Sequence, residues 1–258
     1  MNMKNILLKI EYDGTNFHGW QKQPDKRTVQ GELENALSIV CGEEIKINGT
    51  SRTDAGVHAK GQMANFKADI KIPTDRIKIA VNNILSGGKN GMSVSGDVKI
   101  LDVTEKDVDF HARFDAKGKK YIYKIINSAE ADIFKRNYYY QIEKPLAFNL
   151  MQEAAIHIVG TKDFKSFQAA GGEEKQTTVR TIHSLKIINA EEKGIDIEVI
   201  GDGFLYNMVR IIAGTLVDIG LGKISPDSMP YIIESCDRQN AGHTAPPQGL
   251  YLAEVYYM

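Results

Sequence analysis

Residues 5–12 read NILLKIEY and place apolar or aromatic side chains at every second position. The apolar face is formed by Ile6, Leu8, Ile10 and Tyr12. This period of two predicts a β-strand with one face in a core. Further along, residues 29–41 read VQGELENALSIVC, in which apolar residues recur at helical spacing. They predict an amphipathic helix that Gly42 ends.

Strand and helix patterns alternate along the rest of the chain. Further strands are predicted at 44–48, 62–68, 92–103, 121–126, 180–188, 194–200 and 250–257. Further helices are predicted from an N-cap at Thr74, at 150–159 behind an Asn149 cap, at 206–219, and after Ser225 and Pro226. The pattern predicts an α+β (α/β-like) fold of two similar halves, each a mostly antiparallel sheet flanked by helices. We place an N-terminal α/β domain at 1–107 and a C-terminal α/β domain at 108–258.

Composition narrows the class of protein. The 258 residues include 32 Lys and Arg against 33 Asp and Glu, and the formal net charge of -1 excludes binding of nucleic acid through bulk charge. A local basic cleft remains compatible with that balance. Cys41 and Cys236 are too few for a disulfide framework or a thiolate zinc site. Without a signal peptide or a long apolar run, the chain is expected to be soluble and cytoplasmic.

The run Ser51 to Ala59, SRTDAGVHA, lies between two predicted strands, where loops often carry catalytic groups. Asp54 and Gly56 also suit an ordinary turn, which is the plainer interpretation. The alternative is that Asp54 is a carboxylate nucleophile. Such a group must be ionised at neutral pH, and a guanidinium beside it would lower its pKa. Arg52 and Arg210 are the candidates.

Arg210 stands in the apolar helix YNMVRIIAGTLVDIG. It either lies on a solvated face or points inward, where a charge needs an acidic partner. We expect Asp54 to be that partner.

Two further features favour a nucleic-acid ligand. Residues 111–124, HARFDAKGKKYIYK, interleave five basic residues with Phe114, Tyr121 and Tyr123, which suits phosphate contact and base stacking. The alternative is a solvated hairpin turn with tyrosines in the core. Trp20, in FHGWQ, either contacts RNA or anchors packing.

A metal site is the rival hypothesis. Asp54 and His58 are four residues apart, which would align two ligands on a helix. Gly56 between them and the lack of a nearby third ligand argue against it. Phosphate-loop and dinucleotide glycine motifs are also absent from the sequence, so no cofactor is expected.

The motifs as a set resemble the TruA family of tRNA pseudouridine synthases over nearly the whole chain. The opening Y-D-G-T-x-F-x-G-W-Q-x-Q stands at 12–23, and R-T-D-A-G-V-H-A stands at 52–59. F-H-A-R-F stands at 110–114, with Tyr121 seven residues on. F-L-Y-N-M-V-R-I-I stands at 204–212, and A-G-x-T-A-P-x-x-G-L stands at 241–250.

The resemblance implies the pseudouridine synthase fold, with an active-site cleft between the halves, and isomerisation of uridine to pseudouridine at tRNA positions 38, 39 and 40. It implies Asp54 as nucleophile, Tyr121 stacked on the target uracil and Arg210 paired with the aspartate. Arg52 would help displace the target nucleotide, and Leu250 would wall the uracil pocket. It also implies a homodimer that holds the tRNA anticodon arm across both subunits, without metal or organic cofactor.

The chain departs from the family at 86–91, where SGGKNG predicts a mobile loop, and at Lys162, which replaces a common His. These departures leave open a second hypothesis, a tRNA-binding chaperone without catalysis. A metal-dependent hydrolase using Asp54 and His58 is the third.

Overall fold

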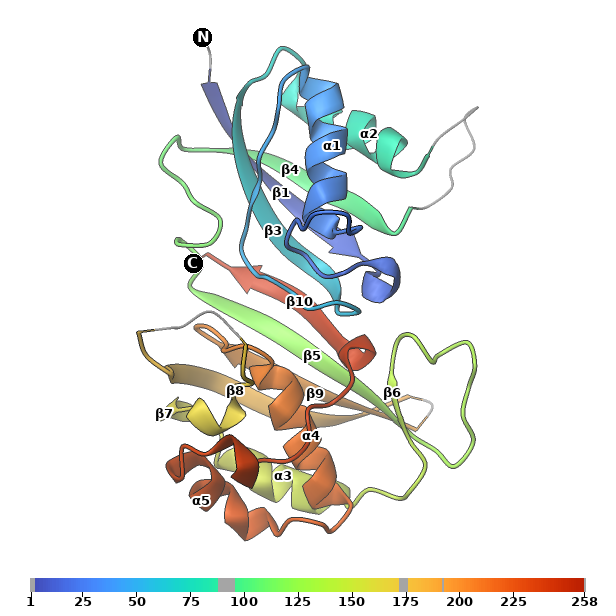
Figure 1. Ribbon diagram of the computed structural model, residues 1–258, viewed down its shortest axis with the longest axis vertical. Helices are drawn as coiled ribbons and strands as arrows, with labels where there is room; N and C mark the ends of the chain where they lie inside the picture. The colour runs from blue at the N-terminus through green and yellow to red at the C-terminus, as the bar shows by residue number, and fades with distance from the viewer. Residues whose placement is uncertain (1–2, 88–95, 172–175, 192, 258) are drawn as a thin grey trace. The chain divides into compact units, whose positions relative to one another are not determined.

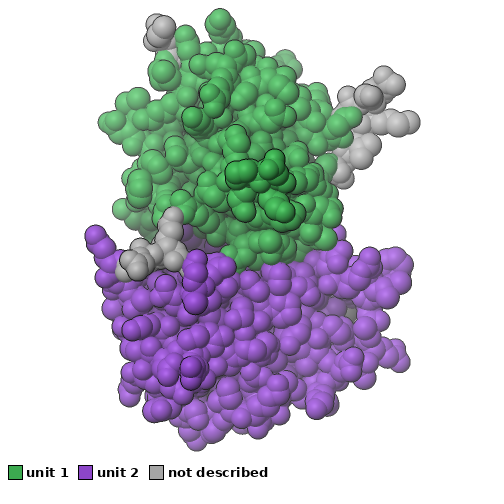
Figure 2. Space-filling model, in the orientation of Figure 1, with its two compact units in different colours: residues 1–117, 252–258 green, residues 118–251 purple. Residues whose placement is uncertain are grey.

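The computed structural model describes residues 3–87, 96–171, 176–191 and 193–257 (Figure 1). The chain divides into two compact units, which Figure 2 distinguishes by colour. Unit 1 comprises Met1–Lys117 and Leu252–Met258, and unit 2 comprises Gly118–Tyr251.

The described residues of unit 1 form antiparallel strands and two helices. Its strands are β1 (Met3–Tyr12), β2 (Asn48–Gly49), β3 (His58–Asp69) and β4 (Val98–Lys106). They run in the order β4-β1-β3, and the short β2 pairs with the far edge of β3. Helix α1 (Val29–Cys41) packs on α2 (Thr74–Leu85), which packs on β4 (Figure 1). The predicted inner face of the first strand is confirmed, because all four of its side chains are buried.

Helix α1 has the bounds that the apolar spacing predicts. Thr28 caps it by accepting a hydrogen bond from the backbone N–H of Gly31 at 3.3 Å. Gly42 ends it in the left-handed region, with φ of 74°.

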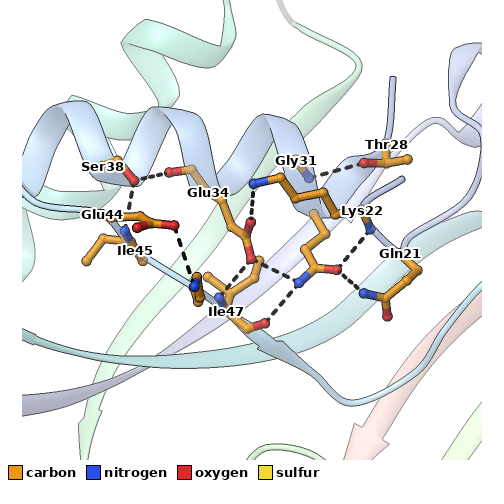
Figure 3. Close-up of polar contacts among 11 residues, drawn as sticks. Gln21, Lys22, Thr28, Gly31, Glu34, Ser38, Glu44, Ile45 and Ile47 are labelled. Carbon is orange, nitrogen blue, oxygen red and sulfur yellow. Dashed lines mark hydrogen bonds and ion pairs between the residues drawn. The ribbon is translucent and has the colours of Figure 1, made fainter. Parts of the chain in front are cut away.

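The predicted strand at 44–48 is wrong, because only Asn48 and Gly49 form a ladder. Side chains of α1 take the backbone donors of this stretch instead. Ser38 Oγ accepts from Ile45 N at 2.9 Å, and Glu34 Oε1 accepts from Ile47 N at 3.2 Å (Figure 3). With those donors satisfied by the helix, the stretch follows α1 rather than a neighbouring strand.

In unit 2 the strands are mostly antiparallel and run in the order β5-β9-β8-β7. Its strands are β5 (Gly118–Asn127), β6 (Tyr140–Ile142), β7 (Gly160–Asp163), β8 (Val179–Ala190) and β9 (Gly194–Gly201). The short β6 pairs with β5 in parallel. The helices are α3 (Phe148–Ile156), α4 (Met208–Gly220) and α5 (Met229–Glu234). The last strand, β10 (Leu250–Tyr256), begins in unit 2 and ends in unit 1.

The α+β prediction is confirmed, since the strands of each unit are mostly antiparallel and helices pack on them. In unit 2, α3 and α4 pack together, α4 on β5 and α3 on β8 (Figure 1). The sheet face with the buried Tyr121, Tyr123 and Ile197 forms part of the core.

Several predicted element ends differ from the structure. Thr74 is the first helical residue of α2, because the preceding Pro73 takes the cap position. Asn149 lies inside α3, which starts one residue earlier without a side-chain cap. Strand β4 begins only at Val98, and residues 92–95 of that prediction lie outside the described residues. Residues 88–91 of the predicted loop lie outside them as well.

None of the described helices has the length and apolar character that a bilayer span requires.

Candidate active site

Asp54 lies in the loop that joins β2 to β3. Its neighbours Ser51 and Thr53 are buried, Arg52 is exposed, and Asp54 itself is half-buried. The loop contains the turn that the residue types predict: Val57 N donates to Asp54 O at 3.2 Å. The turn and the functional interpretation are therefore compatible, because the turn presents the carboxylate from a fixed backbone.

The segment 12–20 holds this loop from both sides of Asp54. On one side, Trp20 N donates to Thr53 O at 3.0 Å, and the Tyr12 hydroxyl lies 2.7 Å from Thr53 Oγ1 in a buried hydrogen bond. On the other side, Gly14 approaches so closely that a Cβ there would lie 2.1 Å from Val57 O. The backbone of Asp54 is thus fixed at the residue before it and three residues after it.

Trp20 anchors packing rather than standing exposed for a ligand. Its side chain is 2% exposed, and its ring lies 6.1 Å from that of Tyr12. A Cβ on Gly49 would meet the indole at 2.5 Å, so β2 passes directly against the ring. The packing interpretation of Trp20 is confirmed.

Helix α1 fixes the far end of the same segment. At its start, Gln30 N donates to Trp20 O at 3.0 Å, and Gln30 Oε1 accepts from the backbone N–H of Lys22 at 3.0 Å. The buried carboxylate of Glu34 accepts hydrogen bonds from Gln30 Nε2 at 2.9 Å and from Lys22 Nζ at 3.1 Å (Figure 3). Glu34 is not among the residues predicted from the sequence, although it stands next to Leu33 of the apolar stripe.

His58 is buried at the start of β3 and is engaged by the same segment. Gly14 N donates to its Nδ1 at 3.0 Å, and Asp13 Oδ1 lies 3.2 Å from that nitrogen. Within the described residues, no group of three or more His, Cys, Asp or Glu side chains is placed to hold a metal ion.

Arg210 is half-buried, whereas every other residue of α4 is buried. Its guanidinium is fixed at two points: Nε donates to Ala245 O at 2.8 Å, and one terminal nitrogen donates to Asn207 Oδ1 at 2.8 Å. Asn207 stands before the helix with φ of 58°, a backbone conformation that Asn tolerates better than most residues. Because Asp54 belongs to unit 1 and Arg210 to unit 2, their pairing stays a prediction.

The segment 241–246 holds Arg210 against its own helix. Ala245 N donates to Arg210 O at 3.1 Å, which completes a two-way pairing with Ala245. Upstream, Gly242 N donates to the buried Thr215 Oγ1 at 2.9 Å. A Cβ on Gly214 would lie 1.9 Å from His243 O, so only a glycine at this position lets the backbone of His243 pass this close to the helix.

Asp218, near the end of α4, fixes the same segment electrostatically. Its Oδ2 lies 2.8 Å from His243 Nδ1 and accepts from His243 N at 3.1 Å, while Oδ1 pairs with Lys223 at 2.9 Å. Burial by itself would raise the pKa of Asp218, but the hydrogen bonds from His243 and Lys223 outweigh it and hold that pKa below its usual value.

Tyr121 lies on β5 and is 8% exposed. Its ring meets Phe204 edge-on, with centroids 5.1 Å apart. The neighbouring Tyr123 is fully buried and donates its hydroxyl to Pro246 O at 2.8 Å. Burial raises the pKa of Tyr123 above its ordinary value. Both tyrosines are therefore largely buried, and the stacking of Tyr121 on the target uracil stays a prediction.

Two lysines of the same strand are paired, and Leu250 is buried. Lys120 meets Glu198 at 2.8 Å, and Lys124 meets Asp196 at 3.2 Å. Leu250 is 6% exposed at the first position of β10.

The family model described as tRNA pseudouridine synthase matches residues 9–115 and 154–258, most of the chain. The chain belongs to the tRNA pseudouridine synthase family. The "tRNA pseudouridine synthase A" of Acetivibrio thermocellus is 49% identical over 255 residues, 99% of this chain and all of that protein. The protein of that name from Ruminiclostridium cellulolyticum is 48% identical over the same shares. "tRNA pseudouridine synthase A 2" of Clostridium tetani is 45% identical over 98% of this chain and 99% of its own.

Among solved structures, "Crystal Structure of a Cbf5-Nop10-Gar1 Complex" is similar at a TM-score of 0.33 and 10% identity, over 83% of this chain and 53% of that chain. A likeness at this level carries no inference.

Membership in the tRNA pseudouridine synthase family confirms the resemblance, the fold class and the prediction of an RNA-modifying isomerase. Asp54, Arg52, Arg210 and Leu250 all fall inside the matched ranges, whereas Tyr121 falls between them. The roles of these five residues stay predictions.

Proposed function

We propose that this tRNA pseudouridine synthase isomerises uridine to pseudouridine at positions 38, 39 and 40 of the tRNA anticodon arm, with Asp54 as nucleophile. The observation that carries the proposal is the match of the family model and of named relatives over nearly the full chain. The fixed backbone on both sides of Asp54 supports the choice of nucleophile, because covalent catalysis requires a closely positioned group.

The reaction breaks the bond from uracil N1 to the ribose C1′ and forms a bond from C5 to C1′. The hydrogen at C5 leaves as a proton, and N1 takes one up, so the reaction involves no net oxidation or reduction. A carboxylate at Asp54 suits either direct attack on C1′ or the capture of a sugar intermediate formed by elimination. The proposal covers both routes.

The remaining candidate residues hold the substrate. The target uridine must leave the base stack, which costs a few kcal/mol. Stacking on Tyr121 would offset about 1–3 kcal/mol of that cost. We assign Arg52 to displacement of the nucleotide and Leu250 to the wall of the uracil pocket. Arg210 supplies a guanidinium whose direction Ala245 and Asn207 fix.

The proposal includes a homodimer and a cytoplasmic location of the enzyme. A homodimer would present basic strips of both copies to one tRNA, which reconciles RNA binding with a formal charge of -1 per chain. We place the enzyme in the cytoplasm, where its tRNA substrate is processed.

The test is tritium release from tRNA labelled with [5-³H]uridine, with EDTA present. The unmodified protein should release tritium, whereas Asp54→Asn should release none and still bind tRNA. Loss of release on chelation would favour a metal-dependent reaction instead. If the unmodified protein binds tRNA without releasing tritium, the chain is a tRNA-binding protein without catalysis and the proposal fails.

A further inference from the structure

Phe114 is the aromatic residue of the basic segment 111–124 that the fold leaves uncovered. Its side chain is 75% exposed, whereas Tyr121 and Tyr123 of the same segment are buried. An exposed phenylalanine leaves apolar surface in water, and its burial against a partner would therefore be favourable.

The turn beneath Phe114 is well ordered by hydrogen bonds, so the ring is exposed from a fixed backbone. His111 N donates to Asp115 Oδ2 at 2.8 Å, and Asp115 N donates to His111 O at 3.0 Å. Arg113 N donates to His111 Nδ1 at 3.1 Å. The carboxylate of Asp115 thus accepts a hydrogen bond from within the turn itself.

The base of the turn is tied to the core of unit 1 through Ala112. Ala112 N donates to the buried Asn65 Oδ1 at 2.9 Å. Ala112 O accepts from Thr50 Oγ1 and from the Tyr257 hydroxyl, each at 2.9 Å. Ordering such a platform in advance reduces the entropy that a ligand must overcome when it binds.

The neighbours of the ring are those of a stacking site for a nucleobase. The His111 ring lies 4.3 Å from the Phe114 ring, centroid to centroid, at an angle of 35°. The Arg113 guanidinium carbon lies 5.9 Å from the Phe114 centroid. Aromatic rings and guanidinium groups stack on unpaired bases, and cationic side chains beside them contact phosphates.

We propose that Phe114, backed by His111 and flanked by Arg113, is a stacking platform for an unpaired nucleobase of the tRNA substrate. This inference rests on the proposed function, because it takes tRNA as the ligand. A second copy of this chain is the other possible occupant. The single ring among the exposed Arg113, Asp115 and Lys117 offers far less apolar surface than the roughly 800 Å² per partner of a stable protein interface.

The test compares the dissociation constants of tRNA for Phe114→Ala, Phe114→Leu and Phe114→Tyr, measured by filter binding at one salt concentration. The Ala and Leu variants should bind about 5- to 150-fold more weakly, because loss of one base stack has that effect. The Tyr variant keeps the ring and should bind about as tightly as the unmodified protein. In tritium release, Ala should raise KM with little change in kcat.

Tyr231→Ala is the matched control, since this ring is also exposed, at 63%, but lies near the acids Asp227 and Glu234 in the chain. It should bind tRNA like the unmodified protein. Equal affinity of the Ala variant and the unmodified protein would overturn the proposal. So would normal binding by the Leu variant, which would indicate apolar contact without stacking.

The oligomeric state separates the two occupants. Light scattering that shows a dimer for the unmodified protein and a monomer for Phe114→Ala would assign the ring to a second copy and overturn the proposal. If the unmodified protein binds tRNA but makes no pseudouridine, the proposed function fails, yet the affinity series still decides the role of Phe114.

Discussion

A single methyl group at Gly14 tests whether the segment 12–20 positions the nucleophile loop. In Gly14→Ala the new Cβ would lie 2.1 Å from Val57 O and 2.5 Å from Val57 C, where ordinary contacts begin at 3.4 Å. Both partners are backbone atoms, so the two segments must separate by roughly 1 Å. A displacement of that size at a reacting group costs about 100-fold in rate.

Val57 transmits the shift because its N–H bonds to the carbonyl of Asp54. We therefore expect Gly14→Ala to lower kcat about 100-fold in tritium release while KM for tRNA stays near its original value. Forced overpacking should also lower the free energy of unfolding by about 1–3 kcal/mol, measured in urea.

Gly203→Ala is the control for the chemistry of the substitution. Its Cβ would meet only the flexible Arg180 side chain, at 3.6 Å, which is an ordinary contact. Its free energy of unfolding should change by no more than about 0.5 kcal/mol. If Gly14→Ala is folded and keeps the original kcat, the segment does not set the position of Asp54 and the reasoning is refuted.

Two further predictions follow from buried polar contacts. Tyr12→Phe removes the buried hydroxyl that bonds to Thr53 Oγ1 and should lower the free energy of unfolding by about 1–3 kcal/mol. In urea titrations the midpoint should fall while the m-value stays unchanged, and an unchanged midpoint would contradict the prediction. The pKa of Asp218 is lower in the folded chain than in the unfolded chain, where it is about 4. The stability that this difference provides is therefore complete above the unfolded pKa and is lost as the pH falls through the folded pKa. Urea titrations between pH 7 and pH 3 should therefore show a steeper loss in the unmodified protein than in Asp218→Asn, and parallel curves would count against this.

Periodicity predicted the elements whose burial is set locally. The α1 helix, the β1 strand and the β8–β9 hairpin follow from apolar spacing because one face of each enters the core. The stretch 44–48 could not be predicted that way. Its backbone donors are taken by Ser38 and Glu34 of the preceding helix, and apolar spacing does not show which acceptor a donor will find.

The candidate site could likewise be predicted only where its residues are close together in the sequence. The motif around Asp54 was visible because the loop is contiguous in sequence. What fixes the loop was not visible, since Tyr12, Gly14 and Trp20 contact residues of the loop that lie 33 to 43 positions further along the chain. The fixed direction of Arg210 likewise depends on Ala245, which the sequence separates from it.

The last strand has a consequence for the order of folding during synthesis. Unit 1 includes residues 252–257, and the Tyr257 hydroxyl oxygen lies 3.0 Å from the Oγ1 of Thr50, four residues before Asp54. Lys117 N likewise donates to Tyr256 O at 2.8 Å. Domains made first on the ribosome usually fold first. Here the first unit to emerge is completed last, after all of unit 2 has been synthesised, so its contacts with the last strand, including the one at Thr50, form only at the end of synthesis.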